Sequence, residues 1–288
     1  MTGFLVNAIV NGLMSGAIYA LIAMGLTLIY GVLHIINFAH GSLLMLGMYV
    51  VFLLATVLGV DPYAALPVVG AGGFVLGYAL YRGVIGRFSH GKDENILLIT
   101  LGLSIILENA ALFVFSPNTN IIRLGYTDDM LIWSDVFIPY TKAISFAASL
   151  VLCAVLSLYI SRSDMGKAIR AVAVERRGAR LVGINVDTVY ALSYGLGTAC
   201  LGAAACLLMP SYYVSPTVGH SFVLIAFTVV VLGGMGSFMG ALVGGLLIGV
   251  AESVSGAFLG EQLGQIAIPV CFILVLLFKP TGLFKGSQ

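Results

Sequence analysis

A few polar side chains stand out in this chain because their chemistry is costly in apolar surroundings. The sequence is 60% hydrophobic and only 9% charged. An uncharged interruption, INFAHGS, carries Asn37, His40 and Ser42, and Glu108 lies inside an apolar segment. At membrane depth such groups can line a path for a polar solute, although hydrogen bonding that only joins neighbouring helices is the alternative.

A second uncharged interruption, VLGGMGSFMG at 231–240, lies late in the chain. Glycine-interrupted segments in the two halves of a membrane protein indicate a transporter's pathway, because unwound backbone can face a polar solute. We therefore expect the two interruptions to border one midplane cavity, while close helix packing is the alternative for the later glycines. Residues of the second interruption assigned to this pathway are Gly233, Gly234, Gly236 and Ser237.

Two other chemistries have weaker support. Glu108 and Glu252 both fall within apolar segments, so either carboxylate could carry a proton or sodium ion in an ion-coupled secondary transporter. Ser237 with His220 could suggest an intramembrane serine hydrolase. A lone serine and a lone histidine in glycine-rich sequence are weak evidence for a nucleophile and its base.

Residues 162–187 form a long charged segment in this hydrophobic chain. The segment holds six of the thirteen basic residues. We expect Asp164 to cap one short helix, Glu175 to start a second, and Asp187 to cap the apolar segment that follows. Short helices on the membrane surface suit docking to a partner. A loop whose arginines only set topology or touch anionic lipid is the open alternative.

The elements that must position these residues are membrane-spanning helices. Runs near or above 18 apolar residues, with so few charges, predict an all-α, polytopic helical bundle. We expect about 8–9 spans, with one or two broken or re-entrant helices, in a single domain over residues 1–288. The first segment is too long for a cleaved signal and is expected to be retained. The apolar segments are 4–30, 43–58, 64–81, 96–115, 143–160, 189–209, 222–232, 238–253 and 263–278.

Charge predicts the orientation of these spans. With the segments 82–95 and 162–187 on the same side as the C-terminus, that side holds eleven basic residues, and the other side holds only Arg123 and Lys142. The positive-inside rule then makes the charged segment and the C-terminus cytoplasmic. The outer side would hold the long loop 116–141.

Several functions are disfavoured by what the sequence lacks. It contains no G-x-x-x-x-G-K-[ST] motif, so the chain has no P-loop of its own, and its net charge of +1 argues against nucleic acid as a partner. Its four cysteines lack metal-ligand spacing and fall in apolar segments, where small packing residues are expected. No enzymatic activity is predicted.

Three separated motifs give the chain a family resemblance. The opening at 11–41 with NFAHG at Asn37–Gly41, the stretch MGKAIRAVAVERRGARLVGIN at 165–185, and the glycine-rich block at 231–253 occur in this order. Together with the closing KPTGLFK, they resemble the permease subunits of branched-chain amino acid ABC importers, the LivH/LivM family, and most closely the LivH type. The likeness extends over nearly the whole chain.

The resemblance implies a role and a set of partners. Such a permease pairs with a second, LivM-like permease, two cytoplasmic ATPase subunits and an extracytoplasmic solute-binding protein, in a bacterial or archaeal inner membrane. ATP and magnesium would then belong to the ATPase subunits, and this chain would hold no cofactor. The segment carried over as the ATPase-coupling element includes Met165, Gly166, Arg170, Ala171, Glu175 and Gly183.

The resemblance implies amino acids as the solute, expected to be leucine, isoleucine and valine, carried by ATP-driven alternating access. The family also includes importers of urea, short amides and aromatic carboxylates, which remain alternatives. Two positions depart from the family's pattern. Some members carry an acidic residue in place of Ser42, and glutamine is frequent in place of Glu108.

Overall fold

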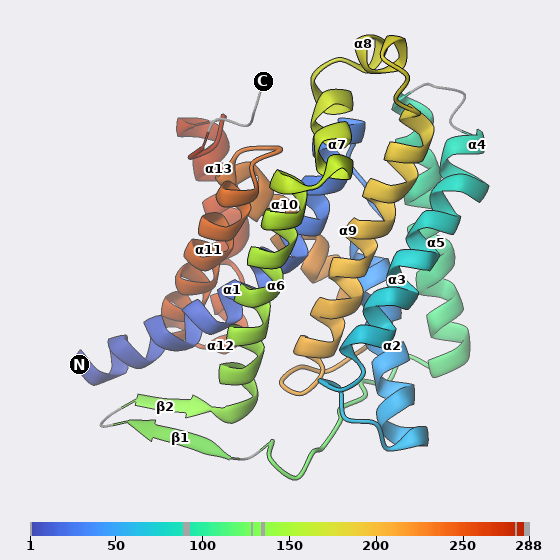
Figure 1. The fold of residues 1–288 in the computed structure, drawn as a ribbon. Helices are drawn as coiled ribbons and strands as arrows, with labels where there is room; N and C mark the ends of the chain where they lie inside the picture. The colour runs from blue at the N-terminus through green and yellow to red at the C-terminus, as the bar shows by residue number, and fades with distance from the viewer. Residues whose placement is uncertain (1, 89–92, 128, 134–135, 280, 285–288) are drawn as a thin grey trace.

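The computed structural model describes residues 2–88, 93–127, 129–133, 136–279 and 281–284, which form a bundle of α-helices (Figure 1). The first half contains α1 (Thr2–Leu33), α2 (His40–Leu58), α3 (Leu66–Leu80), a π-helical turn η1 (Tyr81–Ile85), α4 (Gly86–Phe88), α5 (Asp93–Phe115), β1 (Met130–Trp133) and β2 (Val136–Pro139). The second half contains α6 (Tyr140–Arg162), α7 (Asp164–Val174), α8 (Arg176–Leu181), α9 (Val186–Leu208), α10 (Val218–Gly233), α11 (Phe238–Leu259), α12 (Glu261–Gly264) and α13 (Ala267–Phe278).

Each apolar segment predicted from the sequence forms an apolar helix. Within the described residues, seven helices are long and apolar enough to cross a membrane, which confirms the all-α, polytopic prediction. The other two are α10, with 16 residues, and α13, with 12. At 1.5 Å per residue these span about 24 and 18 Å, less than the roughly 30 Å of a hydrocarbon core. The expected short helix that stops at the late glycines is therefore α10.

The centre of the bundle is made by α1 and α9, whose apolar stretches are 89% and 83% buried. Small residues let other helices approach them closely. A Cβ on Gly12 would lie 2.7 Å from the Gly249 carbonyl oxygen, and a Cβ on Gly16 would lie 2.7 Å from that of Gly245. These paired glycines join α1 to α11, as the four-residue spacing predicts.

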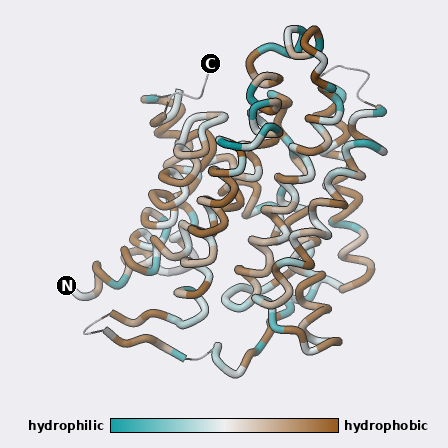
Figure 2. Tube along the Cα trace, in the orientation of Figure 1, coloured by the Kyte–Doolittle hydropathy of each residue, from teal (hydrophilic) through white to brown (hydrophobic). Residues whose placement is uncertain are grey.

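The charged elements gather at one end of the bundle. Helices α7 and α8 project from that end, and the short helix α4 lies at the same end (Figure 1). Hydrophilic residues concentrate there, whereas the long helices are mainly hydrophobic along their length (Figure 2). The end of α1 that carries Leu33 is also there, since Arg176 of α8 contacts it. The geometry thus groups the segments that the charge count assigns to one side.

The opposite end of the bundle carries an unpredicted hairpin. Strands β1 and β2 pair in antiparallel fashion, with Leu131 opposite Ile138. They occupy part of the segment that we expected to be a loop, so that expectation is wrong for 130–133 and 136–139. The strands are only four residues each and are rich in apolar and β-branched residues, a signal too short to separate from a loop.

Candidate functional site

The first interruption is a sharp break between α1 and α2. Helix α1 ends at Leu33 because the next residue, His34, has φ +58°, in the left-handed region that stops a helix. The chain then runs on to Asn37, whose side-chain oxygen accepts a hydrogen bond from the Ala39 amide at 3.1 Å. Asparagine favours such local bonding at a helix start, so α2 begins anew at His40.

His40 is fully buried inside the bundle. Its Nε2 donates a hydrogen bond to the Ile22 carbonyl of α1 at 3.0 Å, and this bond ties the start of α2 to the central helix. Its Nδ1 is buried and has no hydrogen-bond partner among the described residues. Asn37, 2% exposed, lies beside Tyr194 of α9. The break therefore places polar groups in the interior of the protein.

A polar cluster follows directly, with members from α2, α5 and α10. The Ser42 hydroxyl lies 2.7 Å from that of Ser104 and donates to Glu108 Oε1 at 3.1 Å. Ser104 donates to the same oxygen at 3.3 Å. On the other carboxylate oxygen, His220 Nε2 lies 3.1 Å away. Three helices that are far apart in sequence thus supply one hydrogen-bonded carboxylate.

The crossing of α2 and α10 brings this cluster together. Gly41 and Gly219 meet backbone to backbone, and a Cβ on Gly219 would lie 2.8 Å from the Gly41 carbonyl. Side chains at either position would push apart the helices that carry Ser42 and His220.

The surface position of the cluster indicates what it can do. The Glu108 side chain is 14% exposed and that of His220 is 62% exposed, so the cluster opens to one face of the bundle. Polar side chains at such depth face a water-filled cavity or another protein rather than lipid. This face suits the passage of a polar solute.

The second interruption has a different construction, because backbone fills it. The Leu232 and Gly233 carbonyls at the end of α10 accept hydrogen bonds from the Leu283 and Phe284 amides, at 2.7 and 3.1 Å. Gly234 has φ +98°, and a Cβ there would overlap the Phe284 carbonyl oxygen. The segment 281–284 is therefore folded onto the end of α10. The glycines make room for it.

Gly236 and Ser237 serve the start of α11. Gly236 has φ +87°, and the Ser237 hydroxyl accepts a hydrogen bond from the Gly240 amide at 3.0 Å as an N-cap. His220 lies near the other end of α10, 14 residues from Gly234, which is about 21 Å along a helix. The serine–histidine pair of a hydrolase is thus not formed. Gly236 lies beside Gly31, near the end of α1, so the second interruption is close to the start of the first, and their shared role in a pathway stays a prediction.

The second buried acid belongs to another helix pair. Glu252 of α11 is half-buried, and its carboxylate shares a hydrogen bond with Tyr19 of α1. It therefore joins two packed helices and is not part of the cluster around Glu108.

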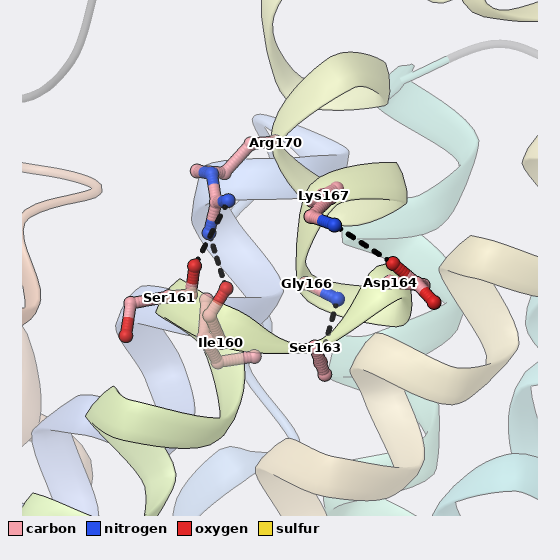
Figure 3. A network of polar contacts seen from close by, with 7 residues as sticks. All are labelled: Ile160, Ser161, Ser163, Asp164, Gly166, Lys167 and Arg170. Carbon is pink, nitrogen blue, oxygen red and sulfur yellow. Dashed lines mark hydrogen bonds and ion pairs between the residues drawn. The ribbon is translucent and has the colours of Figure 1, made fainter.

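The charged segment folds into α7 and α8, as predicted, but with different caps. Figure 3 shows the start of α7, where the Ser163 hydroxyl accepts a hydrogen bond from the Gly166 amide at 3.0 Å. Ser163 is the N-cap, and the prediction of Asp164 is wrong by one residue. The carboxylate of Asp164 instead pairs with Lys167 at 2.8 Å, and this ammonium holds the pKa of Asp164 below its usual range.

Helix α7 is fixed to the end of α6 by Gly166 and Arg170. A Cβ on Gly166 would overlap the Ile160 carbonyl oxygen, so only glycine permits this approach. Arg170 donates hydrogen bonds to the Ile160 carbonyl and, at 3.2 Å, to the Ser161 carbonyl (Figure 3). Carbonyls at a helix C-terminus lack intrahelical partners, and a guanidinium satisfies them. Movement of α7 is therefore tied to α6.

Helix α8 begins and ends at predicted residues. The Glu175 carboxylate accepts a hydrogen bond from the Arg177 amide at 3.0 Å, so it caps α8, and Gly183 has φ +87° just beyond the helix. Asn185, not Asp187, caps α9, by accepting from the Thr188 amide at 3.0 Å.

The other two residues of the predicted coupling set are Met165 and Ala171. Met165 packs on the core, and Ala171 is exposed.

Three exposed apolar side chains at the tip of this segment escaped the sequence analysis. Val174, Leu181 and Val182 are 68%, 89% and 76% exposed. Such strongly exposed apolar side chains on a projecting charged segment are available for contact with another protein. In the sequence, only the pair Leu181-Val182 beside arginines gives a signal for this surface. Ser104 of the polar cluster gives none, and His220 was considered only as the base of a hydrolase.

Comparison with known proteins gives a consistent picture. A family model described as "Branched-chain amino acid transport system / permease component" matches residues 8–278. The chain is 35% identical to the high-affinity branched-chain amino acid transport system permease protein BraD of Pseudomonas aeruginosa, covering 97% of this chain and 95% of BraD. It is 34% identical to the corresponding LivH protein of Escherichia coli, over 96% and 94% of the two chains.

Two more distant similarities extend this result. The LivM permease protein of Salmonella typhimurium is 24% identical over 94% of this chain and 68% of its own length. Among solved structures, a chain of "PsaBC from Streptococcus pneumoniae in complex with Fab" superposes with a TM-score of 0.50 at 16% identity, covering 94% of this chain and 91% of that one. At this identity the likeness concerns the fold alone.

Proposed function

This chain belongs to the family of branched-chain amino acid transport permease components, and on that premise we propose how it works. It is the permease subunit of an amino acid importer, and it moves its solute across the membrane by ATP-driven alternating access. The observation that carries this proposal is the pair of helices α7 and α8, which project from the basic end of the bundle and are fixed to α6 through Gly166 and Arg170. An ATPase subunit that binds these helices could therefore move the bundle.

The proposed solutes are leucine, isoleucine and valine. The permeases BraD and LivH carry branched-chain amino acid transport in their names, and both align with this chain over nearly its full length. The polar cluster around Glu108 suits the charged backbone groups of an amino acid. The proposed pathway runs past Asn37, His40, Ser42 and Glu108.

The proposed partners supply what this chain lacks. A second permease of the LivM kind would cover the polar face that carries Glu108 and His220. Two ATPase subunits, which would hold ATP and magnesium, would dock on α7 and α8 from the cytoplasm, and a solute-binding protein would deliver the amino acid from outside. The basic end of the bundle and the C-terminus are then cytoplasmic, in an inner membrane.

The exposed apolar tip is the proposed contact with an ATPase. Arg170, Gly166 and Glu175 build α7 and α8 and fix them to the bundle, whereas Leu181 and Val182 are free at the surface. The double substitution Leu181→Asp with Val182→Asp should abolish ATPase binding without harming insertion. Reversing the charges of Arg170 and Glu175 should uncouple ATP hydrolysis from uptake, measured in the same assembly.

The deciding experiment is uptake of radiolabelled leucine by proteoliposomes. Samples contain this chain with and without the second permease, the ATPase subunits and the binding protein, with ATP or with an ion gradient. Uptake only in the full, ATP-supplied assembly supports the importer. Gradient-driven uptake by the chain alone would overturn it in favour of a secondary transporter that uses Glu108 or Glu252. Competition by unlabelled isoleucine, valine, urea or aromatic carboxylates then defines the solute.

A further inference from the structure

Arg176 connects α7 and α8, here called the coupling helices, to α1 at the centre of the bundle. Its Nη2 donates a hydrogen bond to the Leu33 carbonyl at the end of α1, at 2.7 Å. Its guanidinium carbon lies 5.6 Å from the centroid of the Tyr190 ring on α9, a cation–π distance. One side chain of α8 thus contacts both helices that form the core.

The contact with Leu33 has a clear physical basis. Leu33 is the last residue of α1, and His34, with φ +58°, turns the chain away from the helix axis. The final carbonyls of a helix lack intrahelical partners and carry its partial negative charge. A guanidinium donates a hydrogen bond to such a carbonyl, and its positive charge offsets the partial negative charge of the helix end. Arg176 therefore acts as a C-terminal cap of α1 that is supplied by another helix.

The surroundings of Arg176 leave the α7–α8 turn room to move. A cavity of about 720 Å³ lies between this turn and the bundle, and its walls include Leu33, His34, Tyr81, Ile96, Arg176 and Tyr190. The turn is thus not packed solidly onto the helices beneath it. Arg176, in the wall of this cavity, holds α8 to α1.

The chain beyond Leu33 leads directly to the polar cluster. Only the segment 34–39 separates the capped end of α1 from α2. In that segment the His34 amide donates to the Tyr30 carbonyl at 2.7 Å and the Ala39 amide to the Asn37 side chain at 3.1 Å, and the Phe38 amide lies 3.4 Å from the Thr100 hydroxyl. Within the first turn of α2, Ser42 bonds Glu108. A displacement of Leu33 therefore acts on this cluster through a short link.

We propose that Arg176 is the positioning residue that transmits movement of α7 and α8 to the break between α1 and α2. This inference rests on the proposed function, in which ATPase subunits move the coupling helices. As α8 shifts, the guanidinium carries the end of α1 with it, and the segment 34–39 reorients Asn37, His40 and Ser42. Arg170 caps the end of α6 in the same way, so Arg170 binds α6 and Arg176 binds α1.

The matched control is Arg82, which has nearly the same local chemistry. Its Nη2 donates to the Thr188 hydroxyl at 3.0 Å, and its guanidinium carbon lies 5.6 Å from the Tyr78 ring centroid. Arg82 belongs to η1 and contacts neither the coupling helices nor α1 in these bonds. Replacing it therefore removes a comparable hydrogen bond and cation–π contact at the same end of the bundle. The variants are Arg176→Gln, Arg176→Lys and Arg82→Gln.

The first measurement is leucine uptake per ATP hydrolysed by the full assembly in proteoliposomes. For Arg176→Gln we expect this ratio to fall roughly fivefold or more, the lower range of coupling between sites, while ATP hydrolysis stays within about twofold of wild type. Arg176→Lys keeps a cationic donor and should lie between. Arg82→Gln should match wild type. Uptake by wild type with an unchanged ratio in Arg176→Gln would overturn the role of Arg176.

The second measurement does not depend on transport. Hydrogen exchange of the amides in 34–39, followed by mass spectrometry, should accelerate in Arg176→Gln and stay unchanged in Arg82→Gln. Equal acceleration in both variants, or none in either, would overturn the link. If the wild-type assembly shows no ATP-driven uptake, the proposed function fails, while selective acceleration in Arg176→Gln still supports the contact between α8 and the α1–α2 break.

Discussion

The two interruptions of this chain look alike in sequence and are built in different ways. Between α1 and α2, the break places Asn37 and His40 in the interior and starts the helix that carries Ser42. Between α10 and α11, the chain packs backbone on backbone, with Gly233 and Gly234 against the segment 281–284. One break exposes polar side chains to the interior of the bundle, and the other is filled by its own chain.

This difference teaches how to interpret glycine in a membrane bundle. Unwound backbone at depth must have its polar groups satisfied. At the first break, side chains do this and leave a polar cluster open to one face of the molecule. At the second, the amides of Leu283 and Phe284 bond the carbonyls of Leu232 and Gly233. The described contacts thus favour the first break for binding a solute and show close packing at Gly233 and Gly234, whose place in the pathway stays a prediction.

The largest expected effect comes from separating the helices at the first break. Gly41→Ala would place a methyl group against the Gly219 carbonyl and force α2 and α10 apart. Overpacking of this kind costs about 1–3 kcal/mol, and here it also displaces Ser42 from Glu108. We expect uptake to fall at least about tenfold.

Gly72→Ala in α3 is the matched control, because no atom lies within 4 Å of the added Cβ. It should transport like wild type. Wild-type uptake by Gly41→Ala, at equal amounts of inserted protein, would remove the first break from the pathway.

A second substitution tests the packing role of the other break. Gly234→Ala combines an unfavourable φ of +98° with overlap of the Phe284 carbonyl, so the segment 281–284 should detach. We expect a lower melting temperature and faster proteolysis of the tail, with uptake per folded permease unchanged. Gly260→Ala, with φ +94° and an open Cβ site, measures the backbone strain alone, about 1–2 kcal/mol.

The stability lost in Gly234→Ala beyond that lost in Gly260→Ala gives the stabilisation that comes from the contact with the segment 281–284. Equal losses would show that the tail does not stabilise α10. A loss of uptake beyond the loss of folded protein would return the second break to the pathway.

A paired substitution compares the two breaks at equal structural cost. Asn37→Ala and Ser237→Ala each remove one side-chain cap of a backbone amide, of Ala39 and Gly240 respectively. Each should cost about 1 kcal/mol of stability. Only Asn37→Ala should lower uptake after correction for folded protein, because Asn37 belongs to the break that leads into the helix carrying Ser42. Equal uptake by both variants would contradict the distinction drawn between the breaks.

The smallest effect is expected within the cluster itself. Glu108→Gln keeps a carbonyl oxygen that accepts from Ser42 and Ser104, and its amide can donate to a neutral His220. Polar contacts between membrane helices average about 0.6 kcal/mol, so uptake should stay within roughly threefold of wild type. Glu108→Leu removes these partners and should reduce uptake more. Complete loss with glutamine would indicate that the carboxylate itself carries a proton.

Much of the fold follows from local sequence signals. Nine apolar segments predicted nine apolar helices, and the four-residue spacing of the glycines at 12 and 16 and at 245 and 249 is typical of helices that approach closely. Glu175 and Gly183 marked the limits of α8. Caps were less predictable. Ser163 and Asn185 compete with Asp164 and Asp187 for the same amides, and all four residue types are good caps.

The sites were only partly predictable. Asn37, His40, Ser42 and Glu108 stood out because polar groups are rare in such a chain. Ser104 did not, and His220 was considered only as a hydrolase base, because their place beside Glu108 carries no signal until α2, α5 and α10 are packed together. Gly233 and Gly234 were assigned to the pathway from their type and position, which did not predict that Gly233 packs on Gly240, and that Gly233 and Gly234 both contact the segment 281–284.

The sequence by itself determined the class of this protein, because hydropathy, charge asymmetry and motif order are properties of neighbouring residues. It established a helical membrane permease with a basic segment between two spans. Only the tertiary structure decided which break carries chemistry and which carries packing. Ser42 meets Ser104 across 62 positions, and Arg176 meets Leu33 across 143. Contacts at such separations depend on how helices pack, which no local pattern specifies.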